Sequence, residues 1–220
     1  MKAFIFDFDT TIFFLFNKNY DRTDVIEKLN KALKKYGIDD IVDRNFFNSL
    51  KLAKDNKECL LEVDSIIKEA EMDALRKGEV IEGAIEFIKE LSKKYKLAVV
   101  SNNAEEVFFK FKEEYLPNID IPFFGRNPLH PEFLKPNPYN LDLALKHLNV
   151  NPNEAYYIGD NTIDYFAAST LNVPFIGMGS IESKYQGLVN LNKDFPIVRT
   201  YKELREVLKI WQNLKRWKRD

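Results

Sequence analysis

Short apolar runs alternate with helix-like segments along most of this chain. After a first run at residues 2–6, such runs recur at 96–101, 121–124, 155–159, 173–178 and 196–198. Segments with apolar residues at helical spacing lie at 84–95, 104–115, 137–148, 163–171 and 201–217. Strands that alternate with helices pair in parallel, because each helix carries the chain back across the sheet. The sequence therefore predicts an α/β fold with a doubly wound, mostly parallel, Rossmann-like sheet.

The alternation is interrupted directly after the first strand. Between about residues 20 and 80 no strand is expected, and helical spacing predicts helices at 21–36, near 46–52 and at 60–78. This all-helical block is interpreted as an insertion. The expected division is an α/β core of residues 1–14 and 82–220 and a helical insertion of residues 15–81.

Two aspartates, Asp7 and Asp9, follow the first strand in the stretch FIFDFDTT at residues 4–11. Burial of an ionised carboxylate inside a strand is costly. In parallel sheets, however, polar chemistry collects beyond the carboxyl ends of the strands. Residues two apart in an extended chain point the same way. Both carboxylates are therefore expected together at the edge of the sheet.

Other polar side chains stand at the ends of later strands or just before a helix: Ser101, Asn102, Lys135, Asp160 and Asp164. Each of them, taken singly, is typical of a turn, a helix cap or a solvated surface. Their succession at strand ends favours a shared site. If the strands are neighbours, one crevice holds these residues together with the two aspartates of the first strand.

Four carboxylates in one crevice require a source of positive charge. Like charges at close range raise one another's pKa and favour protonation. A hard divalent cation removes this conflict, and Mg²⁺ also leaves room for phosphate oxygens. The serine hydroxyl and the lysine can hold the remaining phosphate oxygens. The set therefore predicts a site for a phosphoryl group and Mg²⁺.

The same residues resemble the motifs of the haloacid dehalogenase superfamily, specifically its phosphatase branch. An apolar strand followed by D-x-D-x-T matches residues 7–11, and a serine that ends a strand matches Ser101. A lysine followed by proline matches Lys135-Pro136, and G-D-x-x-x-D matches residues 159–164. The helical insertion is similar to the small cap that closes over the active site in phosphoglycolate phosphatase-like members. The resemblance covers essentially the whole chain.

The resemblance implies an enzyme, a Mg²⁺-dependent phosphatase that hydrolyses a small phosphorylated metabolite through an aspartyl-phosphate. Asp7 would be the nucleophile, and Asp9 would protonate the leaving alcohol and then activate water. The implied metal ligands are Asp7, Asp9 through its backbone carbonyl, Asp160 and, directly or through water, Asp164. The implied phosphate-binding residues are Ser101, Asn102 and Lys135, assisted by a backbone amide near Phe8.

Thr10 departs from the family pattern, because many members carry glycine at this place. A glycine would allow a positive φ or a close approach of the backbone. The threonine therefore predicts a backbone without such strain. The exchange removes no catalytic group.

Other activities on a similar fold remain open. A sugar-phosphate mutase keeps the same aspartate pair and the same kind of cap. A true dehalogenase lacks the second aspartate, so Asp9 argues against it. A signalling receiver domain places its acceptor aspartate in mid-chain and has no helical insertion. An inactive binding protein would be expected to have lost at least one of the matched residues.

The predicted insertion supplies candidates for substrate contacts, because pockets in capped members lie between cap and core. The aromatic candidates are Phe13, Phe14 and Phe16, and the cationic ones are Lys18, Arg22 and Arg44. Simple packing of the aromatic side chains between cap and core is the alternative. A closing cap limits the size of the substrate and disfavours protein or nucleic-acid substrates.

Charge and cysteine content favour a cytoplasmic protein without a nucleic-acid or membrane partner. Thirty-three basic and thirty-four acidic residues give a net charge of −1, so no overall field attracts polyanions. Cys59 is the single cysteine, which fits a reducing compartment. Asp7 and Asp9 interrupt the apolar run that a signal peptide would need. The oligomeric state is not indicated by the sequence.

The segment at 201–217 allows two interpretations. Its apolar residues at helical spacing predict a helix packed on the sheet: Leu204, Val207, Leu208, Trp211 and Leu214. Its basic residues and Trp217 would otherwise form an amphipathic contact with a membrane or RNA. Packing on the sheet is favoured.

Overall fold

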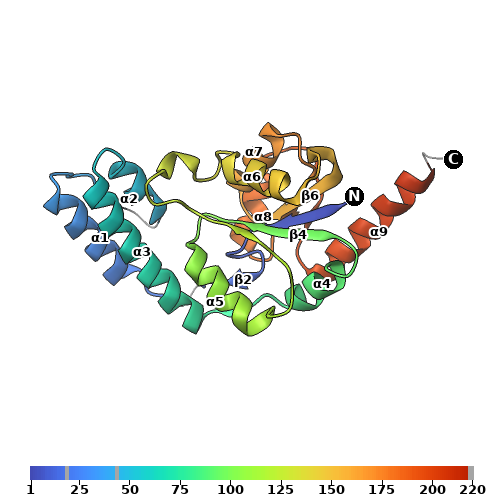
Figure 1. Ribbon diagram of the computed structural model, residues 1–220, viewed down its shortest axis with the longest axis horizontal. Helices are drawn as coiled ribbons and strands as arrows, with labels where there is room; N and C mark the ends of the chain where they lie inside the picture. The colour runs from blue at the N-terminus through green and yellow to red at the C-terminus, as the bar shows by residue number, and fades with distance from the viewer. Residues whose placement is uncertain (18–19, 43–44, 218–220) are drawn as a thin grey trace.

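One parallel sheet of six strands organises the chain in the computed structural model, which describes residues 1–17, 20–42 and 45–217, with side chains as far as Ile210 (Figure 1). The strands are β1 (Ala3–Phe6), β4 (Lys96–Val100), β5 (Phe123–Phe124), β6 (Ala155–Gly159), β7 (Phe175–Met178) and β8 (Ile197–Val198). Their spatial order is β5-β4-β1-β6-β7-β8, and every pairing is parallel. The predicted fold class is therefore confirmed.

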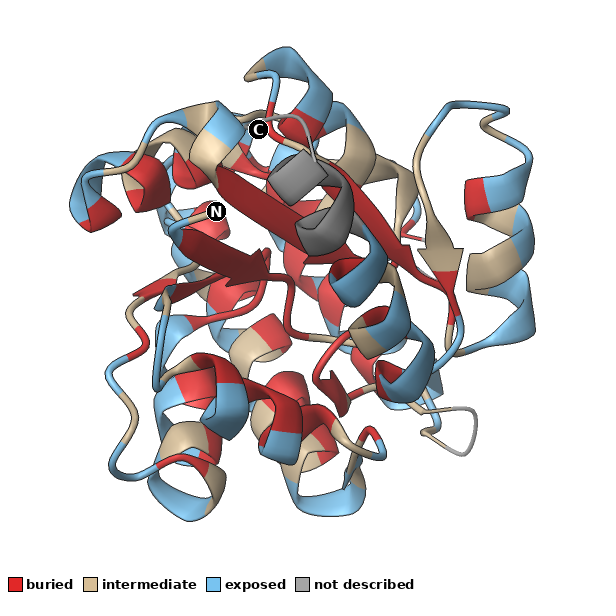
Figure 2. Cartoon of the chain, turned by 90° about the vertical axis from the view of Figure 1, so that its right-hand side faces the viewer, coloured by how far each residue is buried: buried red, intermediate tan, exposed pale blue. Residues whose placement is uncertain are grey.

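Helices cover both faces of this sheet, and strand residues alternate between the two covers. Phe4 and Phe6 of β1 belong to one apolar cluster, whereas Ala3 and Ile5 belong to another. The first cluster includes α4 (Ala84–Leu91), α5 (Glu105–Tyr115) and α9 (Tyr201–Trp217), and the second α6 (Tyr139–Leu148), α7 (Thr162–Thr170) and α8 (Glu182–Val189). Figure 2 shows the buried strands between these helices. Because both faces are covered, the strands are almost entirely apolar, with the exposed Lys96 at the start of β4 as an exception.

Three helices between residues 15 and 78 form a third apolar cluster, away from the sheet. They are α1 (Thr23–Lys35), α2 (Phe47–Leu52) and α3 (Lys57–Lys77), the three helices predicted for this block. The described buried members of their cluster come from residues 25–70, joined by Leu134. Figure 1 places these helices at one end of the molecule, with α3 beside α5 of the core.

A short antiparallel sheet joins the chain before and after these three helices. Its strands, β2 (Phe13–Phe14) and β3 (Glu79–Val80), were not predicted, because two residues are too few to set up a periodicity. Gly78 precedes β3 and lies tightly against β2. A Cβ at Gly78 would lie 2.4 Å from the Phe14 carbonyl oxygen, so only glycine allows this approach.

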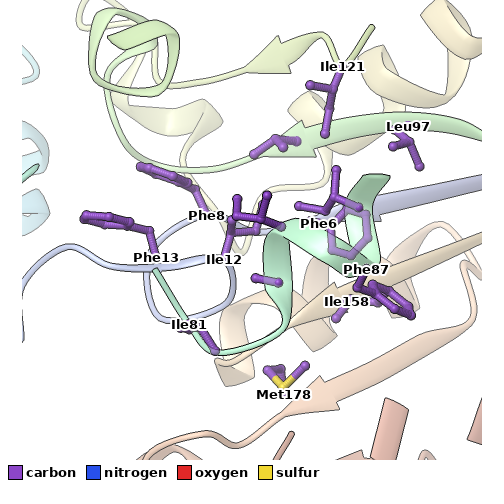
Figure 3. Packing of buried hydrophobic residues seen from close by; sticks show 14 of the residues in the cluster. Phe6, Phe8, Ile12, Phe13, Ile81, Phe87, Leu97, Ile121, Ile158 and Met178 are labelled. Carbon is purple, nitrogen blue, oxygen red and sulfur yellow. The ribbon is translucent and has the colours of Figure 1, made fainter. Parts of the chain in front are cut away.

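An aromatic cluster supports the turn that follows β1. Phe8 and Phe13 are buried, and Figure 3 shows them with Ile12 in the core. The Phe8 ring centroid lies 5.1 Å from that of Phe111 and 5.5 Å from that of Phe108, both on α5. These contacts fix the turn on the face of the sheet that α5 covers.

The C-terminal helix α9 packs on the sheet as expected. Tyr201, Leu204 and Leu208 are buried in the first cluster, and Val207 packs against it. The side chains of Trp211, Leu214 and Trp217 lie outside the described residues. Among the described residues, no helix combines the length and the apolar content needed to cross a lipid bilayer.

Candidate active site

Asp7 and Asp9 follow β1 and line a cavity of about 500 Å³ between the sheet and the helical block. The Asp7 amide donates a hydrogen bond of 2.8 Å to the Ile158 carbonyl of β6, which extends the sheet by one residue. Phe8, between the two aspartates, points into the aromatic cluster instead. The alternation predicted from the sequence is therefore present: the apolar side chain is buried, and both carboxylates face the cavity.

Thr10 adopts a φ of 67°, so the expectation of an unstrained backbone at this position is wrong. A left-handed conformation costs roughly 1–2 kcal/mol for a residue other than glycine. The turn compensates with hydrogen bonds. The Thr10 amide donates to the Phe13 carbonyl at 2.7 Å, and its hydroxyl donates to Asp9 Oδ1 at 3.3 Å.

Lys135 lies at the floor of the cavity and is almost fully buried. Its Nζ donates to Asp7 Oδ1 and to Asp164 Oδ1, each at 2.6 Å, and to the Tyr157 hydroxyl at 3.1 Å. Burial alone would lower the pKa of this ammonium group, but the charges of Asp164 and Asp7 outweigh it and raise the pKa well above its ordinary value. Lys135 is therefore a fixed positive charge beside Asp7.

Asp164 orients Lys135 and the start of α7. Its Oδ1 accepts from Lys135 and from the Tyr157 hydroxyl at 3.0 Å, and its Oδ2 accepts from the Asn161 amide at 3.0 Å. A Cβ on Gly159 would lie 2.6 Å from the Asp164 Cβ, so the glycine of the motif makes room for this side chain. Both oxygens of Asp164 are thus engaged within the chain.

Asp160 has a cationic partner that the sequence did not indicate. Lys184 Nζ, from α8, lies 2.7 Å from Asp160 Oδ2. Burial raises the pKa of Asp160 well above its ordinary value; Lys184 opposes this shift, and the Asp7 and Asp164 charges add to it. Burial likewise raises the pKa of Asp7, with Lys135 opposing the shift and Asp164 adding to it. Lys184 belongs to none of the matched motifs, so its role could not be predicted from the sequence.

The carboxylates of Asp7, Asp160 and Asp164 fit a hard metal ion. One oxygen of each lies within 4.8 Å of the others. In the described part of the chain, two ammonium groups, of Lys135 and Lys184, contact this acidic site, which also contains Asp9. A divalent cation would supply two further positive charges. An oxygen-only donor set of this kind is what Mg²⁺ and similar ions prefer.

The Asp9 carboxylate lies apart from that group of three. Its Oδ1 accepts a hydrogen bond of 3.0 Å from the Leu15 amide. Burial, with the charge of Asp7 as a second cause, raises the pKa of Asp9 to about 6. A carboxyl group of this kind can give up and take back a proton near neutral pH. Its predicted part in metal binding concerns only its backbone carbonyl and stays a prediction.

Ser101 and Asn102 line the same cavity at the carboxyl end of β4. The Ser101 hydroxyl donates to Asn103 Oδ1 at 2.7 Å. The Asn102 side chain is used for another contact, because its Oδ1 accepts from the Lys135 amide at 2.8 Å. The structure thus brings together all the predicted site residues. Asn102 links the loop at residues 101–104, which carries Ser101, to the segment that carries Lys135.

The sequence of most of the chain matches a known protein family. Residues 4–178 match the family described as haloacid dehalogenase-like hydrolase, a span that runs from within β1 to the end of β7. The chain belongs to the haloacid dehalogenase-like (HAD-like) hydrolases. The resemblance inferred from the motifs is confirmed, and the chain is a hydrolase-type enzyme. No curated protein sequence matches it.

Solved structures of other proteins share the fold across nearly the full length of the chain. A predicted phosphatase from Clostridium acetobutylicum has a TM-score of 0.68 at 18% identity, with 94% of this chain and 98% of that chain covered. A predicted phosphoglycolate phosphatase from Haemophilus somnus has a TM-score of 0.62 at 16% identity (94% and 97% covered). A Bacillus subtilis HAD-hydrolase bound to magnesium has a TM-score of 0.58 at 18% identity (94% and 98% covered). At these identities the likeness concerns the fold alone.

In this HAD-like protein, the cavity wall opposite the aspartates comes from the helical block. Of the candidates predicted there, Phe16 and Arg22 line the cavity, and Arg22 Nη2 donates to the Phe16 carbonyl at 2.9 Å. Phe13 is buried in the core, and Phe14 packs against it. Lys18 and Arg44 lie outside the described residues. The wall also includes Asn45, Phe46, Phe47, Asn48 and Lys51.

A buried ionic network that the sequence did not indicate joins the helical block to the loop at residues 101–104. Arg126, just after β5, contacts Asp64 Oδ1 through Nε at 2.6 Å and Glu71 Oε1 through Nη1 at 2.7 Å. Glu71 Oε1 also accepts from Asn103 Nδ2 at 2.9 Å. Burial alone would lower the pKa of Arg126, but the charges of Glu71 and Asp64 raise it. These residues stand far apart in the chain and belong to no short motif.

Proposed function

We propose that this HAD-like hydrolase is a Mg²⁺-dependent phosphatase that hydrolyses small phosphate monoesters through an aspartyl-phosphate on Asp7. The observation that carries the proposal is the contact of the buried Lys135 ammonium group with Asp7, beside Asp160 and Asp164, in a cavity that also contains Asp9 and Ser101. Further support comes from the fold neighbours, among which are a predicted phosphatase and a magnesium-bound hydrolase.

In the first step, a carboxylate oxygen of Asp7 attacks the phosphorus atom, and the bond between phosphorus and the leaving oxygen breaks. Asp9 donates its proton to the leaving alcohol. Lys135 and Ser101 bind the phosphoryl oxygens, together with backbone amides near Phe8 and Asn102. Because these groups are held by the protein before the reaction, little reorganisation is needed in the transition state.

In the second step, a water molecule attacks the phosphorus atom of the aspartyl-phosphate. Asp9 accepts a proton from this water, and the bond between phosphorus and the Asp7 oxygen breaks. Inorganic phosphate leaves, and Asp7 is regenerated as a carboxylate. Microscopic reversibility makes one residue suited to both proton transfers.

Mg²⁺ would be held by Asp7, Asp160 and the Asp9 carbonyl, with Asp164 in support. Bound there, the ion would neutralise charge on the phosphoryl group and on the acidic residues. Lys184 balances the charge of Asp160, and Lys135 balances that of Asp7 and Asp164.

The helical block is proposed to act as a cap of residues 15–81 on a core of residues 1–14 and 82–220. Its apolar cluster is largely its own, and it supplies the cavity wall opposite the aspartates. The leaving group of the substrate would lie against this wall. A cavity of about 500 Å³ suits a small phosphorylated metabolite.

A phosphate-release screen tests the proposal. Wild-type protein and Asp7→Asn are incubated with a panel of metabolite monoesters and an aryl phosphate, with Mg²⁺ and with EDTA. The proposal predicts phosphate release by the wild type alone, lost in EDTA and restored by Mg²⁺. Isomer formation without phosphate release would identify a mutase instead. Equal phosphate release by Asp7→Asn would overturn the assignment of the nucleophile.

A further inference from the structure

The loop at 101–104, which carries Ser101, is held by the buried side chain of Glu71 and by the backbone of Arg126. Glu71 of α3 binds Asn103 Nδ2 at 2.9 Å through Oε1, and its Oε2 accepts from the Ala104 amide at 3.2 Å. The Arg126 amide donates to the Asn103 carbonyl at 3.1 Å. Side chain and backbone of the loop are therefore both fixed.

The Glu71 carboxylate determines how the Asn103 amide is turned. A carboxylate only accepts hydrogen bonds, so the Asn103 NH₂ group must face Glu71. Its oxygen then faces Ser101, whose hydroxyl donates to it at 2.7 Å. This contact holds Ser101 Oγ in place. The hydroxyl hydrogen can rotate toward a phosphoryl oxygen without movement of Oγ.

Glu71 is itself fixed by Arg126. The Nη1 atom contacts both carboxylate oxygens, at 2.7 and 2.8 Å, and Asp64 holds the other side of the guanidinium at Nε. The Glu71 side chain is fully buried, and that of Arg126 is 1% exposed. Buried charges of this kind have no alternative partner in water, so the arrangement is expected to form as a unit.

On the basis of the proposed function, we propose that Glu71 is a positioning residue for the phosphate-binding loop, supplied by the helical block. Because Glu71 lies on α3, the loop is ordered when α3 is docked on the core. Phosphate affinity and docking of the helical block are then one coupled equilibrium. Glu71 does not touch the substrate; it acts through Asn103 and Ala104 on Ser101 and the neighbouring amides.

Four variants of the full chain test this role with inorganic phosphate as the probe. Glu71→Gln removes the charge that holds the loop, and Asn103→Ala removes the bridge to Ser101 but keeps the Glu71–Arg126 pair. Asp64→Asn weakens the Arg126 network from the side that does not touch the loop. Glu106→Gln breaks the exposed Lys68–Glu106 pair, 2.8 Å long, which also joins α3 to α5. Phosphate binding is measured by calorimetry with Mg²⁺ present, and hydrogen exchange is followed at residues 101–107.

Glu71→Gln is expected to weaken phosphate binding at least about tenfold, the loss of one hydrogen bond to a charged group. Asn103→Ala is also expected to weaken phosphate binding, by several-fold. The contacts between Glu71 and Arg126 should stay as they are in the wild type. Exchange at residues 101–107 should accelerate in both. Glu106→Gln should bind phosphate within about twofold of wild type, and Asp64→Asn should lose less affinity than Glu71→Gln.

The outcomes separate this inference from the proposed function. Wild-type affinity in both Glu71→Gln and Asn103→Ala overturns the positioning role, as does an equal loss in Glu106→Gln, which would indicate general destabilisation. If Glu71→Gln does not fold, Asn103→Ala decides alone. A wild-type protein that neither binds phosphate nor hydrolyses any monoester overturns the proposed function and the inference with it.

Discussion

Lys135 Nζ lies 2.6 Å from Asp7 Oδ1, although 128 residues separate the two in the chain. Both side chains are buried, and neither charge has much access to water. The lysine therefore balances the charge of the proposed nucleophile before a substrate arrives. It is also close enough to contact the phosphoryl group that Asp7 would attack.

Lys135→Met is expected to reduce kcat/KM for phosphate release at least about 100-fold, the usual effect of losing one preorganised charge-stabilising group. The methionine fills similar space but leaves Asp7 and Asp164 without their cation. Steady-state kinetics against an aryl phosphate measure the loss. Lys146→Met removes an exposed lysine paired with Asp142 and should keep wild-type kinetics. Comparable activity in the two variants would remove Lys135 from the catalytic site.

Mg²⁺ should raise the melting temperature of the metal-free protein, because an ion that binds only the folded state stabilises it. The expected shift is about 5–10 °C at about 100 times the dissociation constant. Asp160→Asn should lose most of this shift. Asp142→Asn, at an exposed carboxylate on α6, should keep it. Thermal scans with and without Mg²⁺ provide the comparison, and an unchanged shift in Asp160→Asn would contradict the proposed ligand set.

Phe8→Ala is expected to lower the free energy of unfolding by about 3–5 kcal/mol, because it leaves a cavity among Phe13, Phe108 and Phe111. Phe109→Ala is the matched control, since Phe109 is 41% exposed, and should cost far less. Urea unfolding measures both. A loss below about 1 kcal/mol in Phe8→Ala would mean that the turn is not fixed by this cluster.

Much of the fold could be predicted because parallel strands and their helices carry strong local patterns. The strand at Ala155–Gly159 has the predicted bounds, and the helix at Tyr201–Trp217 does as well. Because polar residues collect beyond the carboxyl ends of parallel strands, Asp7, Ser101 and Asp160 are expected at one edge of the sheet, and the structure has them there. The division into core and cap stays a prediction.

Features that depend on distant contacts could not be predicted. The positive φ of Thr10 is imposed by the turn over the aromatic cluster, and the residue type pointed the other way. Glu71 and Arg126 read as ordinary charged residues, since their burial arises only when α3 lies on the core. Lys184 reaches Asp160 from a helix that follows the matched motifs. The sequence places such residues on an element but does not indicate what covers them.

Asp9→Asn is expected to separate the two chemical steps. An aryl phosphate has a good leaving group, so Asp7 can still be phosphorylated without an acid. Hydrolysis of the aspartyl-phosphate needs the base and should slow by about 100- to 10,000-fold. The phosphorylated enzyme should therefore accumulate in this variant.

The most direct test of the account is to locate the phosphoryl group on the protein. Asp9→Asn is mixed with an aryl phosphate and Mg²⁺, quenched in acid, digested and examined by mass spectrometry. The account predicts one phosphoryl group on Asp7, absent when Asp7 is also replaced by Asn. Phosphate release by the wild type with no covalent phosphoryl group at Asp7, or with one at another residue, would contradict it.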